Sequence, residues 1–482
     1  MKIETINLPL VVCGDIIEGK GISIFYKTRD PILLTFPTLN KSIIKKLSLA
    51  PDLCEIHIDD LIDFLTNVGD LWKNPNYDLR KESIYLQSKI TGYTVPHIEF
   101  DYKTICATLT HKVLSEMIES EIGDKNLLEE WKINKYVEIR AFPRGKVLHI
   151  LAGNVPAVGI VSLIRGILSK NSNILKLPSG NPVSTLYFVL SFRDVDKFHP
   201  VTRSVSALYW RHGDKVEDFL YKLSNAVCVW GRYDAVFSVR RKTFPGQAIL
   251  EYGPKYSMHI IDKKTLSDEE ALRKVALNAA HDIVLHEQNA CFSPWIIFVE
   301  GDGEKFCEML GEALDEEDKR FPKALPSLDK IAEIAEVRNI CTLLGDKVYR
   351  SSGAKWTVIL TRNPNRMILN PLSRTVFVVP INKLEDAIDY VDSKVMAVGL
   401  SSNEGIERLK NKLSAKGVER ISYIGKLSYP PIGFTSSWEY PITRLVRLVT
   451  RDLSISDLKR VKSLKNVEKL MYGVKSHHIR FM

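Results

Sequence analysis

The regular alternation of short apolar runs with helical patterns, beginning near residue 147, constrains the fold more than any other feature of this chain. The apolar runs are VLHIL (147–151), NILKL (173–177), VSALYW (205–210), AVCVW (226–230), AIL (248–250) and SMHII (257–261), and the helical patterns cover 157–170, the residues after Asn181-Pro182 and about 215–223. Fully apolar strands joined by helices predict a parallel, doubly wound sheet. Such a sheet binds ligands at the carboxyl ends of its strands.

A second α/β series is predicted after a helix over about 267–282. Its segments are WIIFV (295–299), KFCEMLGEAL, WTVIL (356–360), TVFVVP (375–380) and LEDAIDYV (384–391). The first part of the chain is mixed, and apolar side chains spaced from Leu61 to Trp72 indicate one amphipathic helix there. The tail repeats an apolar residue every third position (Leu458, Val461, Leu464, Val467 and Leu470), which predicts a docking helix.

The composition is that of an ordinary globular protein and narrows the class of function. Apolar residues make up 45% and charged residues 26% of 482, a length that predicts two or three domains. The net charge of +9 is spread along the chain and favours anionic ligands such as a phosphorylated cofactor. No basic run interleaved with aromatics indicates nucleic acid. The most apolar run, 157–168, is too short for a membrane span and contains Arg165, and the N-terminus does not resemble a signal peptide.

Seven cysteines are scattered along the chain, without metal-site or disulfide spacing. This pattern fits a reducing compartment, and we expect a cytoplasmic location. Cys291, in LHEQNACFSP (285–294), lies between a polar and an apolar run. A free cysteine is most often an inert buried residue. The alternative is a nucleophile, because a thiolate attacks carbonyl carbon and is also a competent leaving group.

The motifs around these elements resemble the aldehyde dehydrogenase superfamily. They are RAFPRGK, LAGNVP, WGRYDA, the GPK of ILEYGPKYSMHII, and ACFS, and within the superfamily they look most like the LuxC-type fatty acyl reductases over about residues 136–450. The resemblance implies an α/β, aldehyde-dehydrogenase-like fold with a doubly wound cofactor-binding domain, an α/β catalytic domain and a small oligomerisation element. The expected parts are 1–255, with a Rossmann-like region at about 140–255, then a catalytic cysteine domain at 256–425. The segment 426–482 is expected to pack back on the cofactor domain or an oligomer interface.

The resemblance also implies roles for three candidate catalytic residues. Cys291 would attack a thioester and form an acyl-enzyme. Asn154 would direct its amide N–H at the developing oxyanion, together with the backbone N–H of Cys291; otherwise it is a turn residue before proline-restricted backbone. Glu251 falls where hydrolytic relatives carry a water-activating glutamate, so in a reductase it would be turned away or would transfer protons.

Three further residues match cofactor contacts of the superfamily, with NADPH as the expected cofactor. Lys176 corresponds to the lysine near the adenosine ribose, and Gly231 to a glycine that lets backbone approach the dinucleotide. Ser179 stands where NAD-preferring relatives often place glutamate; serine can donate to a 2′-phosphate that a carboxylate would repel. The segment NPLSRTV lacks the expected nicotinamide-ribose glutamate. His281 and His286 are expected to be structural and do not have the spacing of a zinc helix.

The predicted function is NADPH-dependent reduction of a fatty acyl thioester to aldehyde through an acyl-cysteine at Cys291. The donor would be acyl-CoA or an acylated partner protein supplied by an acyl-protein synthetase, and a homo-oligomer is implied; light production is one option for the pathway. Three alternatives stay open. They are an oxidative aldehyde dehydrogenase that uses Glu251 as base, a cysteine hydrolase or acyltransferase without a dinucleotide, and a silent scaffold in an acyl-transfer complex.

Overall fold

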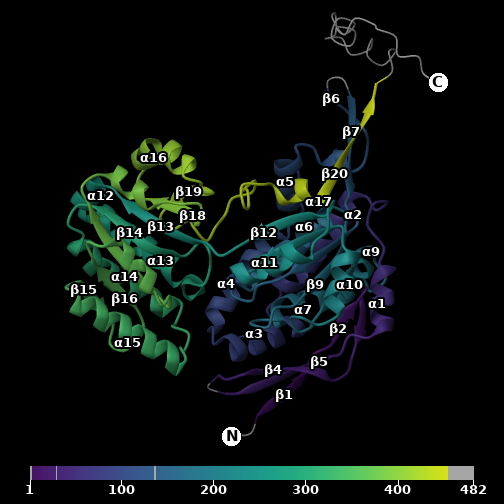
Figure 1. Cartoon of the computed structure of the whole chain (residues 1–482), viewed down its shortest axis with the longest axis horizontal. Helices are drawn as coiled ribbons and strands as arrows, with labels where there is room; N and C mark the ends of the chain where they lie inside the picture. Colours follow the sequence, from purple (N-terminus) through teal and green to yellow (C-terminus); the bar gives the residue numbers. More distant parts are fainter. Residues whose placement is uncertain (1–2, 29, 135–136, 454–482) are drawn as a thin grey trace, which may run out of the picture.

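Two α/β units lie side by side in the computed structural model of the chain (Figure 1). The structure describes residues 3–28, 30–134 and 137–453. The unit drawn mostly in purple and teal contains the first predicted series, and the green unit contains the second. Each unit has its own seven-stranded sheet. The α/β fold class predicted from the sequence is therefore confirmed.

The first sheet has the strand order β12-β11-β8-β9-β10-β2-β3. Its core strands are β8 (Lys146–Ile150), β9 (Ser172–Lys176), β10 (Val205–Leu208), β11 (Ala226–Trp230) and β12 (Ala248–Tyr252), and all five are parallel. The connecting helices are α6 (Ala157–Leu168), α7 (Val183–Leu190), α8 (Phe192–Asp196), α9 (Pro200–Ser204), α10 (Val216–Leu223) and α11 (Tyr233–Lys242). The chain proceeds from β8 outward through β9 to β10 and then crosses to β11 and β12. The order thus reverses between β8 and β11, where doubly wound sheets form their ligand crevice.

Buried hydrogen bonds fix helix α6 against this sheet. The ring nitrogens of His149 bond Ser162 Oγ at 2.8 Å and Asn173 Oδ1 at 3.0 Å. Burial lowers the pKa of His149 to about 4, so the imidazole is neutral and can pair with both partners. A side chain at Gly166 would place its Cβ only 1.9 Å from Asn173 Oδ1. This close approach of helix and strand sets the position of the loop that joins β8 to α6.

The second sheet has the order β15-β16-β17-β14-β13-β18-β19 and is parallel except at β15. Its strands are β13 (Tyr256–Ile261), β14 (Pro294–Glu300), β15 (Lys347–Arg350), β16 (Thr357–Leu360), β17 (Thr375–Ile381), β18 (Val395–Leu400) and β19 (Arg420–Tyr423). Its helices are α12 (Lys263–Ser267), α13 (Glu269–Val284), α14 (Glu304–Arg320), α15 (Leu328–Leu343) and α16 (Asn403–Ala415), with 3-10 segments η2 (Leu285–Gln288), η3 (Pro364–Leu369) and η4 (Leu384–Tyr390). The run at 257–261 begins this sheet, so grouping it with the first series was wrong; an apolar strand pattern does not reveal which sheet it joins.

The N-terminal region contributes helices to the first unit and strands to two sheets. Its helices are α1 (Lys41–Ser48), α2 (Ile58–Lys73), α3 (Asp78–Thr91), α4 (Val95–Thr108) and α5 (His111–Ile122), with the 3-10 segment η1 (Lys125–Leu128). Strand β2 (Leu10–Val12) extends the first sheet antiparallel to β10, and β3 (Asp15–Ile17) pairs antiparallel with β2. Strands β1 (Glu4–Asn7), β4 (Gly21–Tyr26) and β5 (Ile32–Pro37) form a separate sheet. The periodicity of 61–72 thus identified α2, whereas the strands before it gave no comparable signal.

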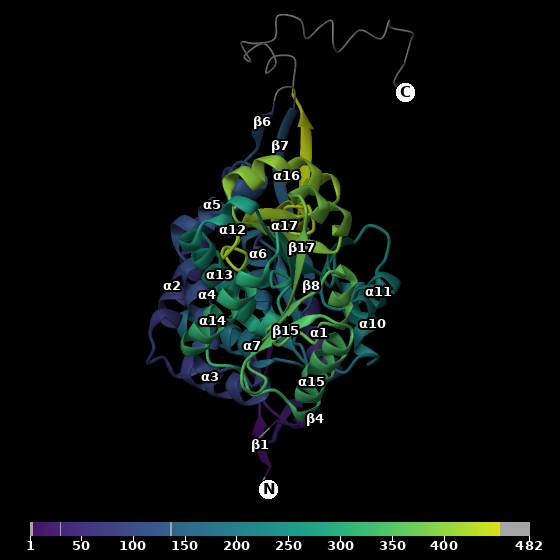
Figure 2. The same ribbon diagram turned by 90° about the vertical axis from the view of Figure 1, so that its left-hand side faces the viewer.

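A three-stranded antiparallel sheet projects from the first unit (Figures 1 and 2). It consists of β6 (Lys132–Asn134), β7 (Val137–Pro143) and the late strand β20 (Val446–Asp452). Helix α17 (Pro441–Leu445), just before β20, packs against α5 and α6. The predicted tail helix at 458–470 lies outside the described residues. Within the described ranges, no helix is both long and apolar enough to cross a membrane.

Candidate active site

The loop after β8 carries Asn154 and reaches the second unit. Asn154 Nδ2 donates to the backbone carbonyl of Asn289 at 2.7 Å. A Cβ at Gly153 would lie 2.6 Å from the backbone nitrogen of Asn181, so only glycine allows this close turn. An amide nitrogen has two N–H groups, so Asn154 keeps one for another acceptor. The structure therefore brings Asn154 against the segment that contains Cys291.

Cys291 lies in the short loop between η2 and β14 and is partly exposed. Its carbonyl accepts a hydrogen bond from Ser257 Oγ at 2.8 Å. The side chain of Gln288 donates to the carbonyl of Pro294 at 2.9 Å, which ties the two ends of the loop together. The thiol is thus carried by a short loop with both ends fixed, at the carboxyl end of helix α13.

The thiol form of Cys291 is favoured in this structure. The pKa of Cys291 is raised to about 12, mainly by burial and next by the negative charge of Glu419, whereas Lys255 and the backbone N–H groups of Cys291 and Phe292 act to lower it. At neutral pH the resting group is therefore a neutral thiol. Nucleophilic attack requires loss of that proton during the reaction.

Two of the charged groups that shift the pKa of Cys291, Lys255 and Glu419, form a buried ion pair. Lys255, from the GPK motif, pairs with Glu419, and its ammonium stands 3.8 Å from the ring centroid of Trp438. Glu419 also accepts from the backbone N–H of Ser437 at 2.9 Å. Glu419 thus raises and Lys255 lowers the pKa of the Cys291 thiol, and the effect of Glu419 is the larger.

Tyr93 connects the Asn154 loop of the first unit with the segment that precedes Cys291 in the second. Its hydroxyl lies 3.2 Å from the carbonyl oxygen of Asn154 and 3.0 Å from that of His286, and it accepts from Asn289 Nδ2 at 3.4 Å. Sequence reasoning missed this residue, because a tyrosine at the end of an N-terminal helix carries no distinguishing motif. One hydroxyl thus spans the Asn154 loop and the segment leading to Cys291.

Glu251 lies at the end of β12 with its carboxylate bound to a neighbour. Arg240 on α11 donates to both carboxylate oxygens, each at 2.5 Å. The backbone carbonyl of Glu251 accepts from Ser437 Oγ at 2.7 Å. The side chain is therefore held toward α11 by a bidentate ion pair, a strong geometry for carboxylate.

The three residues matched to a cofactor lie at the carboxyl ends of two strands of the first sheet, β9 and β11. Gly231 ends β11 and leads into helix α11, where a Cβ would lie 3.0 Å from Ala235 Cβ. Lys176 ends β9 with its ammonium 5.5 Å from the Trp210 ring centroid, and burial lowers its pKa. Ser179 is exposed in the loop after β9, with Oγ 3.0 Å from the Tyr209 hydroxyl.

A hollow of about 440 Å³ lies nearby against α11, lined by His212, Asp234, Phe237, Ser238, Arg240 and Arg241. The backbone N–H groups at the N-terminus of α11, which begins just after β11, suit an anionic dinucleotide. The residues present thus fit the group that the sequence pattern predicts.

The two histidines near the cysteine occupy polar positions without metal geometry. His281 bonds the Tyr429 hydroxyl at 2.8 Å. Burial lowers the pKa of His286 to about 4, which keeps it neutral beside Asp101, 3.8 Å away. Among residues 3–28, 30–134 and 137–453, no group of three or more potential ligands could hold a metal ion.

The chain has the fold of the aldehyde dehydrogenases. Over 92% of this chain, an NADP-dependent enzyme from E. coli superposes with a TM-score of 0.73 at 12% identity, covering 98% of that chain. Aldehyde dehydrogenase 21 from Physcomitrella patens superposes with a TM-score of 0.72 at 12% identity, covering 96% of this chain and 100% of that one.

Sequence similarity identifies the family. Residues 53–448 match the acyl-CoA reductase (LuxC) family, and the chain belongs to it. A long-chain acyl-protein thioester reductase from Vibrio harveyi is 32% identical over 92% of this chain and 93% of its own length. The protein of the same description from Photorhabdus luminescens is 32% identical over 86% of each chain. The resemblance predicted from the motifs is confirmed.

Proposed function

We propose that this protein reduces a fatty acyl thioester to aldehyde with NADPH, through a covalent acyl intermediate on Cys291. The observation that carries the proposal is the 2.7 Å hydrogen bond from Asn154 to the carbonyl of Asn289, which places an amide donor beside the cysteine loop. A thiol next to a fixed N–H donor is the arrangement that acyl transfer requires. Family membership supports the same reaction.

The first step exchanges one thioester for another. Cys291 Sγ, after losing its proton, attacks the carbonyl carbon; the new carbon–sulfur bond forms and the bond to the donor thiol breaks. The departing thiolate takes up a proton. The free N–H of Asn154 and the backbone N–H of Cys291 would stabilise the negative charge on the carbonyl oxygen.

The second step releases aldehyde. A reduced nicotinamide cofactor supplies a hydride to the acyl carbon when bound. The Cys291 carbon–sulfur bond then breaks as the carbonyl reforms, and the sulfur leaves with the electron pair and regains a proton. The chain's own contribution is to hold the acyl group on Cys291 and to donate hydrogen bonds to its oxygen.

The proposed cofactor is NADPH, held by Gly231, Lys176 and Ser179. The carboxyl ends of β8 and β11, where the strand order reverses, and the start of α11 suit the diphosphate, and Lys176 offers a positive charge near the loop after β9. Ser179 presents a hydroxyl where a carboxylate would repel a 2′-phosphate.

The ion pair of Glu251 favours reduction over oxidation to acid. A reductase must keep water from hydrolysing its acyl-enzyme. A general base needs a carboxylate oxygen within hydrogen-bond reach of the water it activates, whereas both oxygens of Glu251 accept from Arg240. This contact supports the reductive assignment.

We also propose an acylated protein as the acyl donor and a homo-oligomer as the assembled form. Relatives described as acyl-protein thioester reductases suggest an acylated protein as donor, with acyl-CoA as a small-molecule substitute. The sheet formed by β6, β7 and β20 would mediate self-association, because it projects outward and exposes Ile133, Leu448 and Val449.

The test is the intact mass of the protein after incubation with a series of acyl-CoAs, with and without NADPH. We expect a mass increase equal to one acyl group without NADPH, located on Cys291 by peptide mapping, and its loss with release of aldehyde when NADPH is added. Acid as the only product would favour an oxidative or hydrolytic enzyme. Acyl transfer without any nicotinamide binding would favour an acyltransferase.

A further inference from the structure

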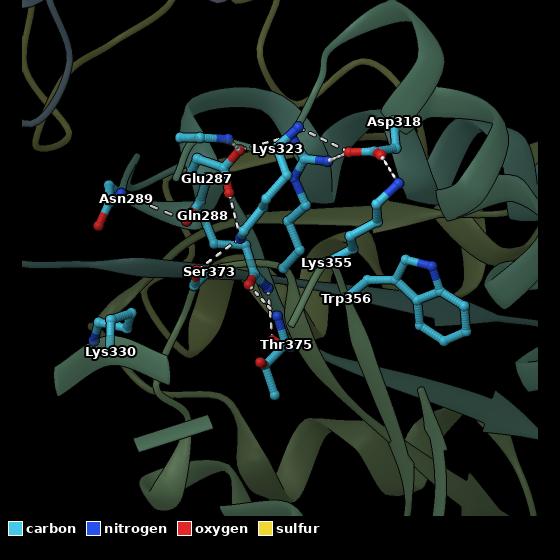
Figure 3. A network of polar contacts seen from close by, with 12 residues as sticks. Glu287, Gln288, Asn289, Asp318, Lys323, Lys330, Lys355, Trp356, Ser373 and Thr375 are labelled. Atoms are coloured by element: carbon cyan, nitrogen blue, oxygen red, sulfur yellow. Dashed lines mark hydrogen bonds and ion pairs between the residues drawn. The ribbon is translucent and has the colours of Figure 1, made fainter. Parts of the chain in front are cut away.

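A buried polar network centred on Glu287 borders the loop that carries Cys291 (Figure 3). Arg374 is fully buried and donates to Glu287 Oε1 at 2.6 Å, to Asp318 Oδ1 at 2.7 Å and to the carbonyl of Phe321 at 2.8 Å. Lys323 pairs with Glu287 Oε2 at 2.5 Å. Arg374 belongs to NPLSRTV, the segment that lacks the predicted nicotinamide-ribose glutamate. This segment therefore makes internal contacts that the reaction steps above do not use.

The network joins two short runs of left-handed backbone. His286, Glu287 and Gln288 have φ of 54°, 51° and 62°. The second run is Leu372, Ser373 and Arg374, with φ of 62°, 56° and 61°. Side chains disfavour this region, and such backbone persists only where its surroundings over-determine it.

Specific hydrogen bonds hold the two runs against each other. The backbone N–H of Ser373 donates to the carbonyl of Glu287 at 3.1 Å. The amide of Gln288 accepts from Thr375 N–H at 2.7 Å and donates to the Thr375 carbonyl at 2.8 Å. The same amide donates to Pro294, at the far end of the Cys291 loop. The hydrogen bonds from the second run thus fix the backbone conformation of residues 286–288, which precede Cys291.

We propose that Arg374, acting through Glu287, is a positioning residue for Cys291. The proposal rests on the proposed role of Cys291 as nucleophile. The Arg374 guanidinium links its own segment to Glu287 and to the segment of Asp318 and Phe321. Without it, Glu287 loses this partner, and the left-handed run 286–288 is free to relax. Asn289, which receives the hydrogen bond of Asn154, directly follows that run. The consequence is loss of alignment between the thiol and the donors that meet the carbonyl oxygen.

The test compares two reactions of the same thiol in the full-length protein. Acetylation by 4-nitrophenyl acetate places negative charge on a carbonyl oxygen and uses the aligned donors. Alkylation by iodoacetamide uses the same thiolate to displace iodide, but it places no negative charge on a carbonyl oxygen. Both rates are measured at the Cys291 peptide by mass spectrometry, and their ratio cancels any change in thiolate fraction that affects both reactions alike.

We expect Arg374→Gln to lower the ratio of acetylation to alkylation by about tenfold or more, since one oxyanion donor alone typically contributes that much. Glu287→Gln should lower the ratio in the same direction. The matched control is Arg338→Gln, because Arg338 is also buried and donates to Thr357 Oγ1, Gly353 and Trp356 rather than to Glu287. The control ratio should stay within about twofold of the wild type.

An unchanged ratio in Arg374→Gln would overturn the proposal. If that variant does not fold, Glu287→Gln decides the matter by the same criterion. Wild-type protein that reacts with 4-nitrophenyl acetate at Cys291 but not with dodecanoyl-CoA would refute the proposed substrate and leave the positioning role standing. A wild type that is not acetylated at Cys291 would refute both.

Discussion

The guanidinium of Arg240 binds the carboxylate of Glu251 through both oxygens, at 2.5 Å each. Arg240 comes from α11 and Glu251 from β12, so the helix that starts after Gly231 also restrains this carboxylate. A water-activating glutamate in a hydrolytic relative needs a free oxygen directed at the acyl group. Because Arg240 occupies both oxygens of Glu251, this side chain supports the reductive assignment over the oxidative one.

Glu251→Gln should leave the lifetime of the acyl-enzyme nearly unchanged when NADPH is absent. Loss of a working general base would slow hydrolysis by about 10²–10⁴, so a small effect is readily distinguished. Arg240→Met frees the carboxylate and should shorten the lifetime. Arg241→Met, at the neighbouring exposed arginine, is the control. The measurement is decay of the acylated mass with time; a much longer lifetime in Glu251→Gln would support the oxidative assignment.

Cys291→Ala should abolish acyl labelling and aldehyde formation, because no other group would then form the thioester. Cofactor binding should stay within a few-fold of the wild type, since the residues proposed to hold it lie in the other unit. Cys54→Ala is the control, as Cys54 is also partly exposed. Acyl labelling is followed by intact mass and cofactor binding by nicotinamide fluorescence. An alanine variant that still takes up the acyl group would exclude Cys291 as nucleophile.

The reactivity of Cys291 should rise steeply with pH. Because burial raises the pKa of this thiol to about 12, the thiolate fraction of the free enzyme should increase with each step in pH from neutral to 10. Glu419→Gln removes a negative charge that opposes ionisation and should lower the pKa, which accelerates alkylation at pH 8. Lys255→Met removes the opposing positive charge and should slow it. Iodoacetamide labelling of Cys291 measures both effects, with Cys54 as internal reference; a faster reaction in Lys255→Met would contradict this electrostatic account.

Ser179→Glu should weaken NADPH binding more than NADH binding. A carboxylate close to the 2′-phosphate costs on the order of 1–3 kcal/mol for a partly desolvated pair. Ser179→Gln supplies a matched side chain without the charge and should have the smaller effect on the ratio of the two dissociation constants. If all three proteins bind the two cofactors with the same ratio, Ser179 does not face the ribose.

Much of the chemistry could be anticipated from short stretches of sequence. The motifs LAGNVP, WGRYDA and NACF placed Asn154, Gly231 and Cys291 in one family pattern, and family membership is confirmed. The apolar runs predicted strands β8 to β11 because an uncharged strand of that length is buried on both faces. The short N-terminal strands escaped notice because edge and antiparallel strands carry weaker patterns.

The sequence by itself determined the α/β class, the family and the candidate nucleophile, because these depend on local periodicity and on motifs read along the chain. Only the tertiary structure decided the protonation state of the Cys291 thiol, the pairing of Glu251 with Arg240, and the contact of Asn154 with Asn289. It also decided that Arg374 lies against Glu287, although 87 positions separate them in the chain. These relationships depend on burial and on distances between residues remote in sequence. Both the desolvation that raises a thiol pKa and the geometry of an ion pair between remote residues exist only once distant segments of the chain have packed together.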